Sequence, residues 1–116
     1  MIIILILILI LIYTYTYNYT FVYIYKSKIH GKGLFVRKNF KKNSIIFKAI
    51  GFKNNKPKIT YYGSYINHSY NPNNYIKFNK DGWYIYALKN INNHEELSCD
   101  YTHTPNFIDK PNKNWK

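Results

Sequence analysis

An amide and an imidazole stand side by side at Asn67-His68, directly before a predicted turn. The turn is indicated by Asn71-Pro72-Asn73-Asn74, because proline fixes φ at about −65° and asparagine side chains can close local hydrogen bonds. A polar pair held at a rigid corner after Tyr65-Ile66 indicates a strand end that faces a ligand. The alternative is that both side chains only hold local hydrogen bonds, which is the commoner role of such a pair.

Two other stretches contain residues that could do chemistry. Gly31-Lys32-Gly33-Leu34 lies upstream, and glycine there would let the main chain approach a ligand closely, although the same pattern also fits a simple hairpin corner. Glu95-Glu96-Leu97-Ser98-Cys99-Asp100-Tyr101 lies downstream and ends in a phenol. Tyr101 is one of 14 tyrosines, so plain packing is the alternative to a chemical role.

The elements that must position these residues are predicted to be strands. Short runs of β-branched and aromatic residues alternate with turns rich in Gly and Asn, and no run shows a sustained helical period. Asn79-Lys80-Asp81-Gly82 predicts a β-hairpin between two such runs, whereas Lys53 to Lys58 is predicted to be a charged loop. The expected fold class is therefore mainly β, with strands over residues 23–28, 34–36, 44–50, 75–78, 83–88 and 97–99.

The first 22 residues are predicted to be a separate, low-complexity segment. Met1 to Ile12 holds only Ile and Leu after the first residue, Tyr13 to Tyr19 alternates Tyr with Thr or Asn, and no charge precedes Lys26. The segment is long enough for a membrane anchor, with the following lysines on the cytoplasmic side. A dispensable tail or an artefactual extension is the rival interpretation, since Tyr-Thr alternation favours a strand. A signal peptide is poorly supported, because a basic start and a cleavage site are missing.

Composition limits the remaining possibilities. The chain has 116 residues, a formal charge of +12 and a sequence pI of about 9.7, so it holds one domain at most and favours acidic partners such as nucleic acid, nucleosomes or an anionic membrane. AT-rich codons would give the same excess of Lys, Asn, Ile and Tyr. Cys99 is alone, which excludes an intrachain disulfide and suits a reducing compartment. The four histidines do not have the spacing of metal ligands.

The order of the three motifs, from about Ile29 to Tyr101, resembles the SET domain, the fold of most protein-lysine methyltransferases. The resemblance implies a SET-like (β-clip) fold of small sheets, with a knot-like crossing of the two C-terminal motifs. The domain is expected at residues 23–103, followed by a tail at 104–116. The implied activity is transfer of methyl groups from S-adenosylmethionine to protein lysine side chains, with histone tails as a candidate substrate class.

The resemblance also implies roles for single residues. The cofactor would be held by Gly31, Lys32, Gly33, Leu34, Asn67 and His68, with Phe107 as a cover over the adenine. Tyr101 matches the catalytic tyrosine, whose phenol oxygen helps to align the amine and to stabilise the cation-like methyl group without adding a full charge. Tyr62, Tyr65 and Cys99 would line the lysine channel, where the small Cys99 leaves room for di- or trimethylated products.

Two departures from the family pattern are visible. The chain cannot build the Cys-rich zinc-binding segment that often follows the domain, and the segment between Phe35 and Asn67 is short and basic where the family often has a longer, acidic one. The alternative function is therefore a weakly active or inactive SET-like module that binds nucleic acid or chromatin through its basic surface. The expected location is the cytoplasm or nucleus of a host cell, or a membrane if residues 1–25 are a genuine anchor.

Overall fold

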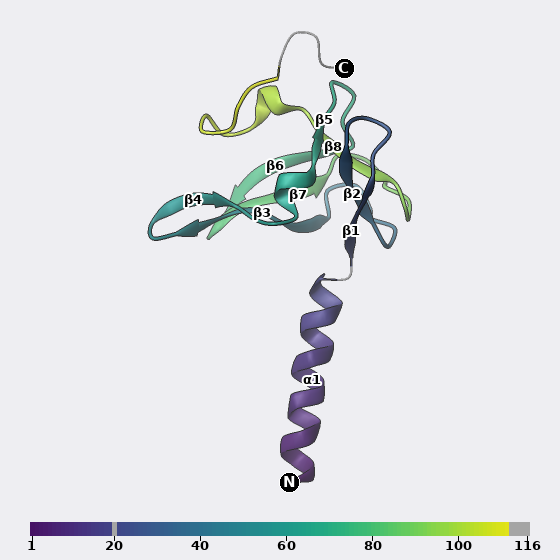
Figure 1. Ribbon diagram of the computed structural model, residues 1–116, viewed down its shortest axis with the longest axis vertical. Coiled ribbons are helices and arrows are strands. Elements are labelled where there is room, and N and C mark those ends of the chain that lie inside the picture. Colours follow the sequence, from purple (N-terminus) through teal and green to yellow (C-terminus); the bar gives the residue numbers. More distant parts are fainter. Residues whose placement is uncertain (20, 112–116) are drawn as a thin grey trace.

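Short strands are the predominant regular secondary structure of the protein, which confirms the prediction of a mainly β fold (Figure 1). The computed structural model describes residues 1–19 and 21–111. In chain order its strands are β1 (Val22–Lys26), β2 (Lys32–Val36), β3 (Ile45–Lys53), β4 (Lys56–Ile59), β5 (Asn67–His68), β6 (Asn74–Asn79), β7 (Gly82–Ala87) and β8 (Glu96–Cys99). The helical elements are α1 (Ile2–Tyr19) and two single 3-10 turns, η1 (Gly63–Tyr65) and η2 (Tyr101–His103).

The last strand of the chain lies in the middle of the sheet. The strand order is β1-β2-β8-β6-β7-β3-β4, so β8 is inserted between β2 and β6, and β5 pairs with β8 as a side branch. The pairing of β5 with β8 is parallel, with Asn67 opposite Ser98 and His68 opposite Cys99. The segment around β5 and the segment around β8 therefore lie side by side, although they are far apart in the sequence, and we call this place the crossing.

The predicted hairpin at residues 79–82 is present between β6 and β7. Its two loop residues are Lys80 and Asp81, and Gly82 already begins β7. A side chain at position 82 would be impossible without a shift, because a Cβ atom there would lie 2.4 Å from the carbonyl oxygen of Ile50 on the neighbouring strand β3. Glycine at this position therefore allows β7 to approach β3.

The loop predicted for Lys53 to Lys58 is wrong, because this segment forms a second hairpin. Lys53 ends β3 and pairs with Lys56 at the start of β4. The two residues between them, Asn54 and Asn55, have φ values of 53° and 63°, which is the conformation that a two-residue hairpin turn requires and asparagine tolerates. Pro57 is accommodated because β4 is an edge strand, where a missing N–H group breaks no ladder on the open side.

The N-terminal segment is a helix rather than the strand that Tyr-Thr alternation favoured. Helix α1 projects away from the strands in Figure 1, and the side chains of Ile2 to Tyr13 are exposed. A strand needs a neighbour for its backbone hydrogen bonds, whereas a helix satisfies its own, so a segment that leaves the sheet adopts the helix. Within the described part of the chain, no helix is long and apolar enough to cross a membrane.

Amide side chains hold the central strand in place beside an aliphatic core. Leu34, Ile85 and Leu97 are fully buried in that core, and Asn74 is buried with them. The Asn74 side-chain nitrogen donates to the carbonyl oxygen of Ser98 (2.9 Å) and to the side-chain oxygen of Asn73 (2.9 Å). Asn73 in turn accepts from the backbone N–H of Ser98 (3.1 Å) and donates to the carbonyl of Glu96 (2.7 Å). The asparagines of the predicted turn thus bind β8.

We expect Asn73→Ala to lower the free energy of unfolding by about 2–4 kcal/mol, because the substitution leaves buried backbone groups of β8 without partners. Urea unfolding would show this as a lower midpoint at an unchanged slope. The matched control is Asn71→Ala in the same turn, whose side chain is exposed and should change stability by less than about 0.5 kcal/mol. Equal effects of both substitutions would contradict this role of Asn73.

Candidate functional site

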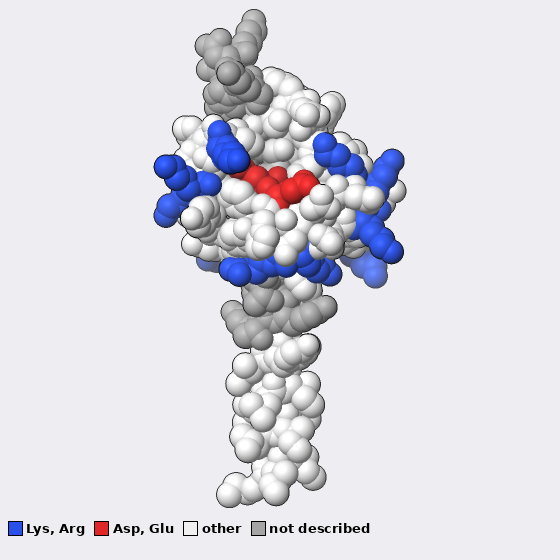
Figure 2. Space-filling model, turned by 90° about the vertical axis from the view of Figure 1, so that its right-hand side faces the viewer, with Lys and Arg blue, Asp and Glu red and all other residues white. Residues whose placement is uncertain are grey.

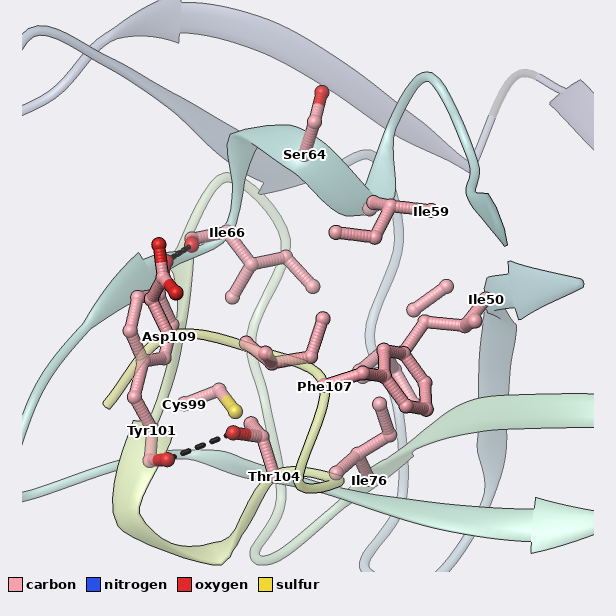
Figure 3. Close-up of a pocket in the computed structure, with 14 residues that line it drawn as sticks. Ile50, Ile59, Ser64, Ile66, Ile76, Cys99, Tyr101, Thr104, Phe107 and Asp109 are labelled. Atoms are coloured by element: carbon pink, nitrogen blue, oxygen red, sulfur yellow. Dashed lines mark hydrogen bonds between the residues drawn. The ribbon is translucent and has the colours of Figure 1, made fainter. Parts of the chain in front are cut away.

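Tyr101 is fixed at both ends by residues of the crossing segment. Its backbone N–H donates to Nδ1 of His68 (3.1 Å), and the two rings lie 5.2 Å apart. Its hydroxyl donates to the backbone carbonyl of Ile66, directly before β5 (Figure 3). The motif at residues 66–68 therefore sets the orientation of the phenol, although the two motifs lie far apart in the sequence.

Asn67 joins the glycine turn to strand β8. Its side-chain nitrogen lies within hydrogen-bonding distance of the carbonyl oxygens of His30 (3.0 Å) and Lys32 (3.3 Å), on either side of Gly31. The same nitrogen lies 3.0 Å from a carboxylate oxygen of Glu96. The structure therefore brings the three predicted motifs together at one side chain.

The two glycines of the predicted loop serve different purposes. Gly31 has a φ of +49°, and no atom lies within 4 Å of the place where a Cβ would be, so the main chain is open on that side. Gly33 lies against Glu96, whose carboxylate oxygen would be 2.2 Å from an added Cβ. Gly31 thus offers an accessible backbone, and Gly33 is required by the packing of the protein itself.

Ser27 belongs to this cluster and was missed in the sequence. Its hydroxyl oxygen lies 2.6 Å and 2.9 Å from the two carboxylate oxygens of Glu96 and accepts from the backbone N–H of Ile29 (2.8 Å). A serine that accepts from the N–H two residues ahead is a recurrent turn motif, so its position before the glycine turn was the available signal. Glu96 on β8 thereby links Ser27, directly after β1, to Asn67 of β5.

A pocket of about 420 Å³ lies on the core side of β3 and β7, under the chain that follows η2 (Figure 3). Its walls are mostly aliphatic, and Cys99 and Tyr101 form one side of it. The complete lining comprises Ala49, Ile50, Ile59, Gly63, Ser64, Ile66, Ile76, Ile85, Cys99, Tyr101, Thr104, Phe107, Ile108 and Asp109.

The predicted site residues divide between this pocket and the crossing. Cys99, Tyr101 and Phe107 line the pocket, and Phe107 also packs against Trp83 with ring centres 5.2 Å apart. Tyr62 and Tyr65 pack against the core at the ends of η1, whose Gly63 and Ser64 reach the pocket. The remaining predicted residues, Gly31, Lys32, Gly33, Leu34, Asn67 and His68, lie at the crossing, outside the pocket lining.

Burial keeps both reactive groups of the pocket uncharged. Burial raises the pKa of the Cys99 thiol to about 12, and the nearby Asp100 carboxylate adds to the effect. Burial also raises the pKa of the Tyr101 phenol, with a smaller contribution from Cys99. The pocket therefore offers a neutral phenol and a neutral thiol. Among residues 1–19 and 21–111, no group of three His, Cys, Asp or Glu side chains is placed to hold a metal ion.

The raised pKa predicts that Cys99 is inert in the folded protein. At pH 8 a thiol reagent such as Ellman's reagent should react more than about 100-fold slower with the native protein than with the urea-unfolded chain, because only the thiolate attacks and little of it forms below the folded pKa. Cys99→Ser, which removes the single thiol, serves as the blank. Equal rates for native and unfolded protein would contradict the burial of this thiol.

Comparison with known proteins agrees with this architecture. The family model of the SET domain matches residues 48–102, which include β5, β8 and Tyr101. A crystal structure of a Plasmodium falciparum protein, described as a candidate histone methyltransferase, is 28% identical to this chain, with a TM-score of 0.61. The alignment covers 72% of this chain and 94% of the Plasmodium chain. No curated protein matches. The matched segment and the similar fold support a SET-domain methyltransferase family for this chain.

Proposed function

We propose that the protein transfers methyl groups from S-adenosylmethionine to lysine side chains of a protein substrate. The observation that carries this proposal is the placement of Tyr101 at the wall of an aliphatic pocket, fixed by Ile66 and His68 at the crossing of two segments. The match to a methyltransferase family supports the reaction class. The hydrogen bonds of Tyr101 and its place in the pocket wall support a role for this residue in the reaction.

The residues at the crossing fit S-adenosylmethionine. When bound, this cofactor supplies an electrophilic methyl group on a positively charged sulfur. The open main chain at Gly31 lets backbone groups reach a ligand. Asn67 uses its donor nitrogen for the protein itself, which leaves the amide's carbonyl end as the acceptor for an ammonium group. Phe107 lies not at the crossing but in the pocket lining, where it is about half exposed and can stack on a planar ring.

The pocket suits the substrate side of the reaction. A methyl acceptor must be a neutral amine, and an aliphatic environment disfavours the charged ammonium form of lysine. The Tyr101 phenol stays protonated because burial raises its pKa, so it adds no charge next to the amine. Its oxygen can still hydrogen-bond, and the contacts to Ile66 and His68 hold it without reorganisation. Cys99 stands beside it and is smaller than a phenyl ring, which leaves space for more than one methyl group on the amine.

Histone tails are the proposed substrate class, since the Plasmodium relative is described as a candidate histone methyltransferase. The basic charge of this chain favours substrates that are presented on acidic surfaces such as nucleosomes. We place the reaction in the cytoplasm or nucleus of a host cell, where a reduced cysteine such as Cys99 persists.

Asn67→Ala should weaken the binding of S-adenosylmethionine at least about 10-fold, because it removes the acceptor oxygen and releases the turn around Gly31. Isothermal titration calorimetry on the full chain measures this directly. Circular dichroism must show that the variant is folded, and Asn71→Ala is the matched control with the same chemical change at an exposed position. Unchanged affinity in a folded Asn67→Ala variant would overturn the assignment of the cofactor site.

Tyr101→Phe should reduce methyl transfer by about 10²-fold or more while the affinity for S-adenosylmethionine changes little, because the phenol acts on the amine and not on the cofactor. Transfer of radioactive methyl groups to core histones provides the assay. Tyr61→Phe, which removes an exposed hydroxyl near the same pocket, is the control and should retain activity. Activity within threefold of the wild type in a folded Tyr101→Phe variant would exclude Tyr101 from the reaction.

A further inference from the structure

One open face of the sheet combines tyrosine rings with lysine side chains. The register places Tyr75 opposite Tyr86, and Lys77 opposite Tyr84. On the other side of β7, Tyr84 pairs with Lys48 of β3. Because side chains alternate between the two faces of a sheet, these residues share one face. We call this surface the tyrosine–lysine face, and it comprises Lys48, Lys53, Lys56, Lys58, Tyr75, Lys77, Tyr84 and Tyr86.

The hairpin of β3 and β4 extends this face with lysine side chains and adds no aromatic ring to it. Lys53 pairs with Lys56, and Lys58 pairs with Gly51, so the three lysines follow the same alternation. All three side chains are exposed. The opposite face of this hairpin carries apolar residues instead, since Phe52 pairs with Pro57 and packs against Trp83. The hairpin is therefore basic on one side and apolar on the other.

The rings and the cations of this face are already in contact with each other. Tyr75 and Tyr86 are stacked at 5.4 Å with planes 12° apart. The ammonium group of Lys77 lies 6.0 Å from the ring centre of Tyr86, and that of Lys48 lies 5.5 Å from the ring centre of Tyr84. These contacts restrain the rings before anything binds, so less side-chain freedom remains to be lost on binding.

Acidic residues are almost absent from this face in the described part of the chain. Asp81 lies at its edge and is paired with Lys48 (3.0 Å) and with the hydroxyl of Tyr84 (2.7 Å). Glu95 and Glu96 belong to the other end of the sheet, near β1 and β2. Figure 2, which views the molecule from that end, shows acidic side chains at the centre of the surface and lysine and arginine side chains around its rim. The positive charge of the tyrosine–lysine face is thus barely compensated.

We propose that the tyrosine–lysine face binds single-stranded nucleic acid. Grooves that bind single strands combine cations for the phosphates with aromatic rings on which bases stack, and this face offers both. A duplex keeps its bases stacked on each other and would gain only the phosphate contacts. The face also carries no helix that could enter a groove, which favours the single strand over the duplex.

This binding surface is separate from the pocket. The strands that carry it send their alternate residues, among them Ile50, Ile76 and Ile85, into the pocket on the opposite face. A polynucleotide on the outer face would therefore leave the pocket accessible. The proposal does not depend on methyl transfer and can be tested without cofactor.

Fluorescence anisotropy on the full chain tests the proposal with labelled 12-nucleotide single-stranded RNA, single-stranded DNA and a duplex of equal length. We expect either single strand to bind at least about 10-fold tighter than the duplex, with affinity that falls steeply between low and moderate salt. The comparison of RNA with DNA shows which of the two polymers the face prefers. Equal affinity for single strand and duplex would overturn the proposal.

Two pairs of variants localise the binding. Lys56→Ala combined with Lys58→Ala should weaken binding about 10-fold, whereas Lys26→Ala combined with Lys28→Ala, with the same change of charge on exposed lysines outside the face, should weaken it less than threefold. Tyr75→Ala should weaken binding about 10-fold, whereas Tyr75→Phe should keep the affinity of the wild type, because stacking needs the ring and not the hydroxyl.

Three results would contradict the localisation. Equal losses from the two lysine pairs would indicate general charge attraction, and equal behaviour of Tyr75→Ala and Tyr75→Phe would exclude stacking. Tight binding to vesicles that contain phosphatidylserine, lost in the same lysine variant and unaffected by competing single-stranded RNA, would assign the face to an anionic lipid surface instead.

Discussion

The parallel pairing of β5 with β8 is the constraint on which the rest of the structure depends. It joins Asn67 and His68 to Ser98 and Cys99, and β8 must also fill the gap between β2 and β6. A strand in the middle of a sheet needs partners for its N–H and C=O groups on both sides. Neighbouring strands supply only part of these, and the amides of Asn73 and Asn74 supply others. Polar side chains thus supply hydrogen bonds to the backbone of β8 where the short neighbouring strands end, and the aliphatic core packs beside them.

The same side chains that hold the crossing also form the candidate site. Asn67 donates to the glycine turn and to Glu96, His68 receives the backbone N–H of Tyr101, and Tyr101 donates to Ile66. Each of these residues is held by hydrogen bonds within the protein, and Tyr101 also lines the pocket. The site is therefore preorganised as the fold forms, and Ser27 and Glu96 support Asn67 from behind. Substitutions here affect stability and binding together, so folded variants and matched controls are needed to separate the two.

The sequence predicts the local features well and the long-range ones poorly. The hairpin at residues 79–82 follows from turn chemistry, and the meeting of the three motifs follows from their order in a known family. The hydrogen bond from Ser27 to Glu96 and the one from Asn74 to the carbonyl of Ser98 were not predicted, because the partners lie far apart in the chain and no local pattern marks them. The hairpin of β3 and β4 was missed for another reason, since its Asn-Asn turn lies within a charged segment that lacks alternation. The alternation at residues 13–19 indicated a strand, but this part of the chain is a helix, which satisfies its backbone hydrogen bonds within itself.

The period of two in β-strands explains how one small sheet can carry two sites. Along β3, β6 and β7, alternate residues turn Ile50, Ile76 and Ile85 toward the pocket and Lys48, Lys77 and Tyr84 toward solvent. A shift of register by one residue would exchange the two sets and destroy both surfaces at once. The bulges between Ile45 and Phe47 and between Lys48 and Ile50 keep Phe47 and Ile50 on the core side of β3 while Lys48 stays outward. Burial of the aliphatic set fixes the register, and the register in turn fixes the spacing of rings and cations on the outer face. The core beneath β3, β6 and β7 therefore sets the spacing of the rings and cations on these strands, although none of these residues is fully buried.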